Sequence, residues 1–158
     1  MPTPAWRNPK LVMDHRLIAI TLGGLLPAIM LGIAGIFQKF STNGGIGTGP
    51  FLIGVGVITV IVGGVFLVIE KQVVVTGQSA AFTVLYGLMW ATATGFIALA
   101  LGRYNGQISQ LVPLYNMNTL VAVVLGLLIF AEWRHVDPVK LLVAAVLIVA
   151  GGVLAARA

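Results

Sequence analysis

The sequence contains no cysteine and very little charge. Without a thiol the chain can form neither a disulfide, a thiolate metal site nor a cysteine nucleophile. Charged residues make up 8% of the 158 residues and hydrophobic residues 59%, whereas a soluble domain usually carries about 25% charged residues. Because so few polar side chains cannot coat a water-soluble globule of this size, we expect an integral membrane protein.

Acidic residues are also scarce, and none lies near the centre of an apolar stretch. Glu70 and Glu132 each stand at the end of one. This argues against a carrier that exchanges protons for cationic drugs at a mid-membrane glutamate. His15 and His135 lie in separate polar flanks and are too few for a zinc site. With no nucleophile elbow or phosphate-binding loop, we predict no catalytic residue, no metal, no cofactor and no enzyme activity.

Five long apolar stretches fill the rest of the chain. A bilayer core of about 30 Å requires about 20 apolar residues in a helix, and each stretch has that length or nearly so. Their continuous apolar character predicts helices, since a membrane strand would alternate apolar and polar residues over about ten positions. They are Leu17–Gln38, Gly49–Ile69, Ser79–Leu101, Gln107–Ala131 and Val139–Ala156.

These stretches define the expected organisation. Residues 1–16 form a polar, cytoplasmic N-terminal lead, and residues 17–158 form an all-α transmembrane domain of five helices. Asp137 and Pro138 are typical of a helix cap followed by proline in the first turn, so they are expected to open the fifth helix. The odd number of spans places the two termini on opposite sides of the membrane.

The distribution of Lys and Arg predicts the orientation. The nine cations are scattered singly and form no basic patch, so we predict no nucleic-acid partner despite the net charge of +5. Six of them fall on the N-terminal side and three on the other, which predicts a cytoplasmic N-terminus and an external C-terminus in the cytoplasmic membrane. The six are Arg7, Lys10, Arg16, Lys71, Arg134 and Lys140; the three are Lys39, Arg103 and Arg157.

The third span combines polar and small residues. Thr83, Tyr86, Trp90 and Thr94 recur at helical spacing, so they share one broad face. Beside them run Gly87, Ala91 and Gly95, whose spacing of four residues lets helix backbones approach closely. One edge of this helix is therefore expected to pack against a neighbour, and the next edge presents an indole, a phenol and hydroxyls.

The fourth span carries a proline followed by several polar side chains. Pro113 has no N–H, so the Ser109 carbonyl would lose its helical partner and the helix would kink. Tyr115, Asn116, Asn118 and Thr119 follow at once. Two interpretations stay open. In the first, the kinked helix and its free polar groups build a mid-membrane binding site, as in many transporters. In the second, the same side chains bind no ligand and serve to hydrogen-bond neighbouring helices.

A charged pair follows the fourth span. We place Glu132 and Arg134 at the cytoplasmic rim of the candidate site. Glu132 could equally pair with Arg134 or Lys140, or cap a helix at the interface.

Several short features of the chain carry a family resemblance. They are Leu31-Gly32 through Lys39, Arg103 in a short turn, Pro113, Glu132 and Gly151-Gly152. With these residues the chain resembles an EamA domain, the five-helix unit of the drug/metabolite transporter superfamily. The resemblance implies secondary transport of a small metabolite, with the site between helices of two such domains. Most members carry two domains in one chain, so a single domain implies a dimer with a second copy or a related five-helix protein.

Three functions are therefore carried forward. The first is a transporter subunit that binds a small metabolite through Tyr86, Trp90, Thr94 and the residues around Pro113. The second is a subunit of a lipid-carrier flippase that requires a different partner chain. The third is a membrane scaffold subunit that transports nothing.

The predicted orientation can be tested with terminal tags. We expect a C-terminal tag to be accessible from outside the cell and an N-terminal tag to be inaccessible, as the positive-inside rule requires. Such a single location would exclude an antiparallel homodimer, and would leave a parallel pair or an inverted partner of another sequence. Equal accessibility of the C-terminal tag from both sides would contradict the predicted orientation.

Overall fold

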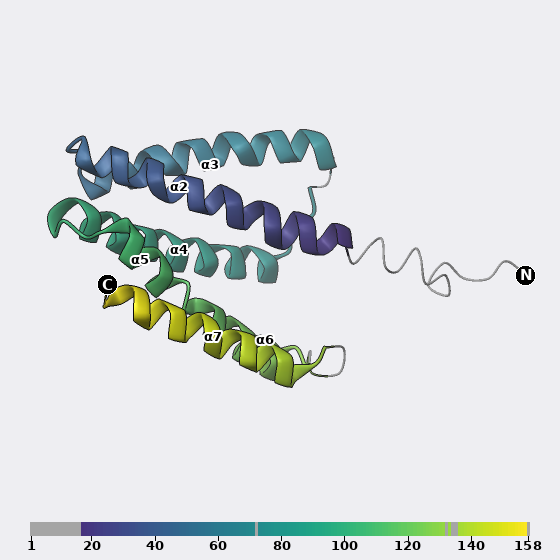
Figure 1. Ribbon diagram of the computed structural model, residues 1–158. Coiled ribbons are helices and arrows are strands. Elements are labelled where there is room, and N and C mark those ends of the chain that lie inside the picture. Colours follow the sequence, from purple (N-terminus) through teal and green to yellow (C-terminus); the bar gives the residue numbers. More distant parts are fainter. Residues whose placement is uncertain (1–16, 72, 132, 134–135, 158) are drawn as a thin grey trace, which may run out of the picture. The chain divides into compact units, whose positions relative to one another are not determined.

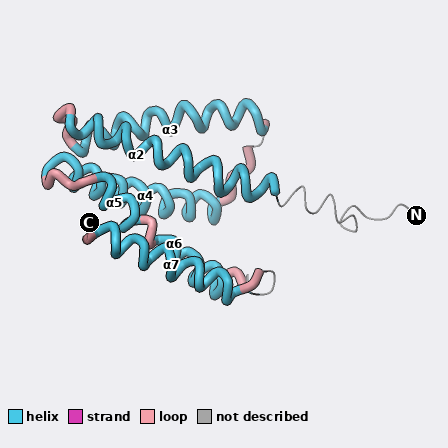
Figure 2. Tube along the Cα trace, in the orientation of Figure 1, coloured by secondary structure: helices cyan, strands magenta, loops and turns pink. Residues whose placement is uncertain are grey.

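The structure is a computed structural model that describes residues 17–71, 73–131, 133 and 136–157. The predicted lead of residues 1–16 and the rim residues Glu132 and Arg134 lie outside the described residues. The described part consists of helices and loops without a strand (Figure 2). In chain order its elements are η2 (Thr21–Leu25), α2 (Leu26–Asn43), α3 (Thr48–Glu70), α4 (Gly77–Arg103), α5 (Ile108–Tyr115), α6 (Asn118–Ile129) and α7 (Pro138–Ala156) (Figure 1).

Five helical stretches of the described chain are long and apolar enough to cross a membrane. This confirms the prediction of an all-α multi-pass membrane protein, and each stretch coincides with one of the five apolar segments of the sequence. They are Leu17–Asn43, Thr48–Glu70, Gly77–Arg103, Ile108–Ile129 and Pro138–Ala156. The fourth of these is divided into α5 and α6.

Contacts divide the chain into two units, before and after the bond between Gln38 and Lys39. In the first unit a π-helical segment, η2, precedes Pro27. Its geometry is shown by the Leu26 amide, which donates to the Thr21 carbonyl five residues earlier. Proline cannot donate to the carbonyl four residues before it, so the backbone ahead of Pro27 adopts a wider turn instead of a regular α-helical one.

Polar caps begin two of the helices in the second unit. The Thr76 hydroxyl accepts from the Ser79 amide and the Ser79 hydroxyl accepts from the Thr76 amide, which is a capping box at the start of α4. At the start of α7, the Asp137 carboxylate accepts from the amides of Val139 and Lys140 at 3.1 and 3.2 Å, which confirms the predicted cap. The Lys140 ammonium also lies 3.2 Å from Asp137 Oδ2. The pKa of Asp137 is lowered, first by the hydrogen bond from the Lys140 amide and next by that from the Lys140 side chain.

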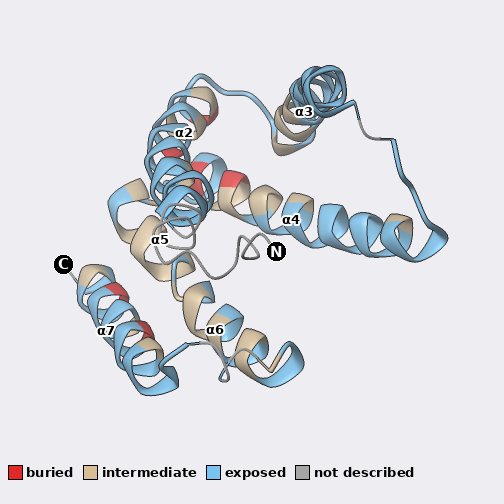
Figure 3. Ribbon diagram, turned by 90° about the vertical axis from the view of Figure 1, so that its right-hand side faces the viewer, coloured by how far each residue is buried: buried red, intermediate tan, exposed pale blue. Residues whose placement is uncertain are grey.

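The helices α3 and α4 pack at a glycine. A side-chain carbon at Gly95 would lie 3.2 Å from Leu52 Cδ1 and 3.8 Å from Thr48 Cγ2, so the missing side chain lets α3 come close to α4. Further along α4, Ala98 and Leu101 are buried (Figure 3). The predicted packing edge of this helix is therefore in use at Gly95. At Gly87, by contrast, a side-chain carbon would have nothing within 4 Å among the described residues.

The end of α2 is tied to the turn between α4 and α5. Lys39 Nζ donates to the Gly106 carbonyl at 2.9 Å, and a side-chain carbon at Gly102 would lie 3.5 Å from Cβ of the buried Thr42. Asn105 takes a left-handed conformation with φ of 53°, which Asn tolerates better than most residues. The Gly106 amide then donates to the Ala100 carbonyl at 2.9 Å, so both the amide and the carbonyl of Gly106 are hydrogen-bonded.

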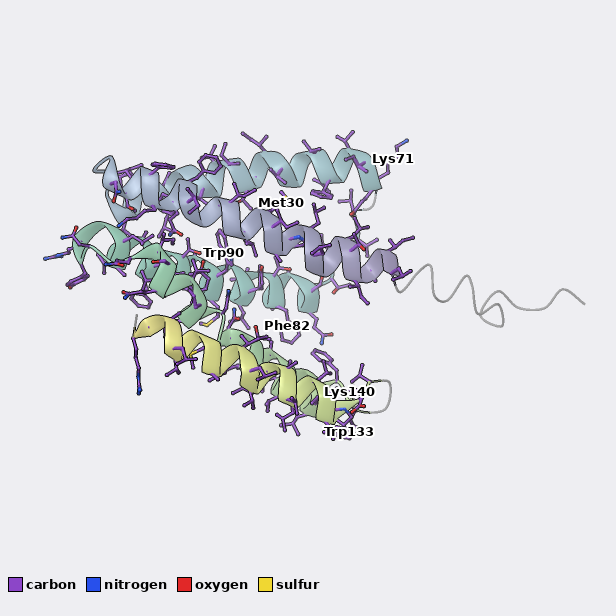
Figure 4. All side chains as sticks on the ribbon, in the orientation of Figure 1. Met30, Lys71, Phe82, Trp90, Trp133 and Lys140 are labelled. Carbon is purple, nitrogen blue, oxygen red and sulfur yellow. The ribbon has the colours of Figure 1, made fainter. Side chains whose placement is uncertain are left out.

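The described cations divide between the two ends of the second unit. Lys71 follows α3 and Lys140 lies in the first turn of α7, and both lie toward the same end (Figure 4). The opposite helix ends carry Arg103, Arg157 and the anchored Lys39. Three of the cations that weight the predicted orientation lie in residues 1–16, and Arg134 is a fourth outside the described residues.

Gly106 leaves no room for a side chain, and this predicts a strong effect of a small substitution. A methyl group there would lie 2.9 Å from Leu111 Cδ1 and 3.0 Å from the Ala100 carbonyl oxygen. We expect Gly106→Ala to lower the free energy of unfolding by about 1–3 kcal/mol, the usual cost of overpacking. Unfolding in mixed micelles of increasing denaturing-detergent content, followed by circular dichroism, measures it.

Gly102→Ala is the matched control, because its new methyl would lie 3.5 Å from Thr42 Cβ, an ordinary contact. It should leave the unfolding curve nearly unchanged. Equal curves for the two variants would show that Gly106 is not sterically constrained.

Candidate functional site

The fourth span is interrupted in the middle of its length. The helix α5 ends at Tyr115, Asn116 and Met117 form a turn, and α6 begins at Asn118. Since the span begins at Ile108, the turn lies about 12 Å along it at a rise of about 1.5 Å per residue. That distance is close to half the thickness of a bilayer core of about 30 Å. In a bilayer crossed by this span, the interruption would therefore fall near the middle of the hydrocarbon core.

The turn is tightened by short-range hydrogen bonds. The Met117 amide donates to Leu114, the Thr119 amide to Asn116 and the Leu120 amide to Met117, each at 3.0 or 3.1 Å and each three residues back. The ψ values of −10° at Asn116 and −15° at Met117 belong to this tighter winding. In a continuous α-helix the Met117 amide would instead bond the Pro113 carbonyl.

The interruption does not lie where proline alone would put it. The missing N–H of Pro113 acts on the Ser109 carbonyl, four residues earlier, yet α5 runs through Pro113 to Tyr115. The helix is interrupted three residues after the proline. Asn116, whose side chain competes for backbone groups, stands at this position and favours a turn.

Polar side chains surround the interruption. Asn116 and Asn118 are exposed, and Tyr115 and Thr119 are half-buried. An amide exposed to hydrocarbon without a partner costs several kcal/mol, of the order of 2–7. Side chains of this kind are therefore expected to face water, another polypeptide or a polar ligand.

A glycine of α7 lies against the Pro113 carbonyl. Gly152 is buried, and a side-chain carbon there would lie 2.7 Å from the Pro113 oxygen and 3.4 Å from Met117 Cγ. The carbonyl that the turn releases from the helix thus meets the backbone of α7. A Cα–H group in such a position is a weak hydrogen-bond donor. In the sequence Gly151-Gly152 served only as part of the family resemblance, so this contact was not predicted.

The predicted polar face of α4 lies at a similar depth. Trp90 is the middle residue of α4 (Figure 4). The side chains of Tyr86 and Trp90 are 70% and 42% exposed, and Thr94 is half-buried. The fourth member of the sequence pattern, Thr83, donates its hydroxyl to the Ser79 carbonyl of its own helix at 2.8 Å.

The two groups of predicted site residues are not packed together. In the second unit the main helix pairings are α5 with α7, α6 with α7, and α3 with α4. The structure brings Pro113, Tyr115, Asn116, Asn118 and Thr119 together through the chain itself, and it places Tyr86, Trp90 and Thr94 on a separate helix. Any ligand that touches both groups would have to bridge α4 and the α5–α6 turn.

Two shallow grooves border α3. One of about 470 Å³ runs from Ser41 and Ile46 to Val62, and one of about 330 Å³ lies between α3 and α4 beside Gly95. Their linings are almost wholly apolar, which suits the acyl chains that surround a membrane helix. No predicted site residue in the described part of the chain lines either groove.

The described residues contain no group of three or more His, Cys, Asp or Glu side chains able to hold a metal ion. The arrangement at the α5–α6 turn offers instead amides, a phenol and a hydroxyl, which bind uncharged or zwitterionic polar groups by hydrogen bonds.

No family model, curated protein or solved structure matches this chain.

The position of the turn predicts that water reaches it. We expect a cysteine introduced as Asn118→Cys to react with a hydrophilic maleimide, because a thiol must be hydrated to ionise. The natural chain has no cysteine, so the introduced thiol is the only one. Val60→Cys is the control, since Val60 is near the middle of α3, 75% exposed and expected to face lipid. Equal, slow labelling of both would mean that the turn is covered by lipid or protein.

Proposed function

We propose that this chain is a transporter subunit with a single EamA-like five-helix domain. It moves a small polar or amphipathic metabolite across the cytoplasmic membrane by alternating access, and it works as a dimer. The proposal joins the family resemblance of the sequence with the position of the polar residues in the structure.

The observation that carries the proposal is the interrupted fourth span. The turn at Asn116 and Met117 divides this span, and the amide side chains of Asn116 and Asn118 are exposed there. A discontinuous membrane helix supplies polar groups at the depth where a transported solute must be bound. In a scaffold subunit the same amides would instead pair with another polypeptide, and no solute would bind.

The candidate residues have distinct roles in this proposal. Asn116, Asn118 and Thr119 supply hydrogen bonds to the solute, and Tyr115 adds a phenol beside them. Tyr86 and Trp90 supply an aromatic wall from α4, since an indole or phenol presents a flat apolar face with a polar edge. Thr94 adds a hydroxyl to the same face, and Glu132 and Arg134 lie at the cytoplasmic rim.

A second domain completes the site in this proposal. The amides and hydroxyls at the turn belong to α5, α6 and the residues between them, and α4 is not a main packing partner of either helix. A second copy, or a related five-helix protein, would enclose the solute between two domains. The N-terminus is placed in the cytoplasm and the C-terminus outside, as the distribution of Lys and Arg predicts.

The proposal is tested by ligand binding to the purified protein. A panel of amino acids, sugars and amphipathic amines is screened for thermal stabilisation, and any hit is followed by uptake into proteoliposomes. We expect Trp90→Ala and Asn116→Ala each to weaken binding about tenfold or more, the effect of losing one buried contact of about 1.4 kcal/mol. Their circular dichroism spectra should stay unchanged.

Val84→Ala and Val121→Ala are the matched controls, because both side chains are exposed on α4 and α6, outside the proposed site. They should bind and transport like the natural chain. Normal transport by both Trp90→Ala and Asn116→Ala would show that the proposed site is wrong. Co-purification with one dissimilar membrane protein, without uptake of any solute, would favour the flippase or scaffold function.

A further inference from the structure

The tightest contact at a helical glycine of the second unit, among the described residues, is at Gly152. A side-chain carbon there would lie 2.7 Å from the Pro113 carbonyl oxygen and 3.3 Å from its carbon. Both atoms belong to the backbone and cannot rotate away, as a flexible side chain could. The adjacent Gly151 differs completely, since nothing lies within 4 Å of the same position there.

The helix α7 packs on both halves of the interrupted span. It is the main partner of α5 and also of α6 (Figure 1). Gly152 meets Pro113 at the end of α5 and Met117 in the turn, so this one residue contacts the backbone immediately before the interruption and a side chain within it. A helix that holds both halves limits the angle between them.

We propose that Gly152 is a positioning residue that holds the α5–α6 turn in the geometry that presents Asn116 and Asn118. The released Pro113 carbonyl seats on the α-carbon of Gly152, and α7 acts as a clamp across the turn. A larger residue at position 152 separates α7 from the turn and opens it. The statement that Asn116 and Asn118 bind a solute rests on the proposed function. The packing of α7 on the turn does not depend on it.

The test compares Gly152→Ala with Gly151→Ala, each combined with Asn118→Cys. Both changes add one methyl group to the same helix and alter its intrinsic propensity equally. Contact between a carbon and a carbonyl oxygen requires about 3.3 Å, so the methyl at position 152 must move α7 by roughly 0.6 Å. We expect the thiol introduced by Asn118→Cys to react with a hydrophilic maleimide about tenfold faster with Gly152→Ala than with Gly151→Ala, as for a local opening made easier by overpacking.

Equal labelling rates in the two folded variants would overturn the proposal. If Gly152→Ala does not yield folded protein, Met117→Ala replaces it, because it removes the side chain beside Gly152 without adding a clash. It should raise the labelling rate in the same direction, and an unchanged rate would again overturn the clamp. Transport by Asn116→Ala is measured separately. If Gly152→Ala speeds labelling while Asn116→Ala transports normally, the role of Gly152 stands and the proposed binding site is wrong.

Discussion

The whole structure depends on the need of each backbone amide and carbonyl to find a partner where water is absent. In a bilayer only a helix meets this need within one segment, which is why five apolar stretches become five helices. The chain departs from regular helix at two prolines, and it resolves each departure differently. Ahead of Pro27 the helix widens to a π turn and keeps its bonds within the segment. After Pro113 the helix stops, and a carbonyl is turned toward another helix.

The second solution links local chemistry to packing. Once the Pro113 carbonyl leaves its own helix, a neighbouring backbone must come close enough to cover it, and only glycine permits that approach. The helix α7 supplies this glycine near its C-terminal end. Asn116 and Asn118 stay exposed beside the covered carbonyl.

Those features of the fold that are set by residues adjacent in the chain could be predicted from the sequence. The five spans follow from length and apolar content, and the cap of α7 follows from Asp137 and Pro138 because cap and amides are adjacent. Pro113 indicated a disturbed fourth span. It did not predict an interruption at Asn116, which also depends on the turn preference of that residue and on support from α7. The contacts of Gly106 with Lys39 and of Gly152 with Pro113 join residues far apart in the chain, and no spacing rule encodes them.

The bond between Lys39 and Gly106 also has a consequence for the order in which the chain assembles. Its two residues are separated by 67 positions, so the second and third spans must be synthesised and inserted before the lysine meets its acceptor. Until then the ammonium group lacks this carbonyl, and an unpaired lysine at a helix end is favoured at the membrane surface, where water can solvate it. The bond therefore joins the end of α2 to the turn after α4 only once the third span is in place.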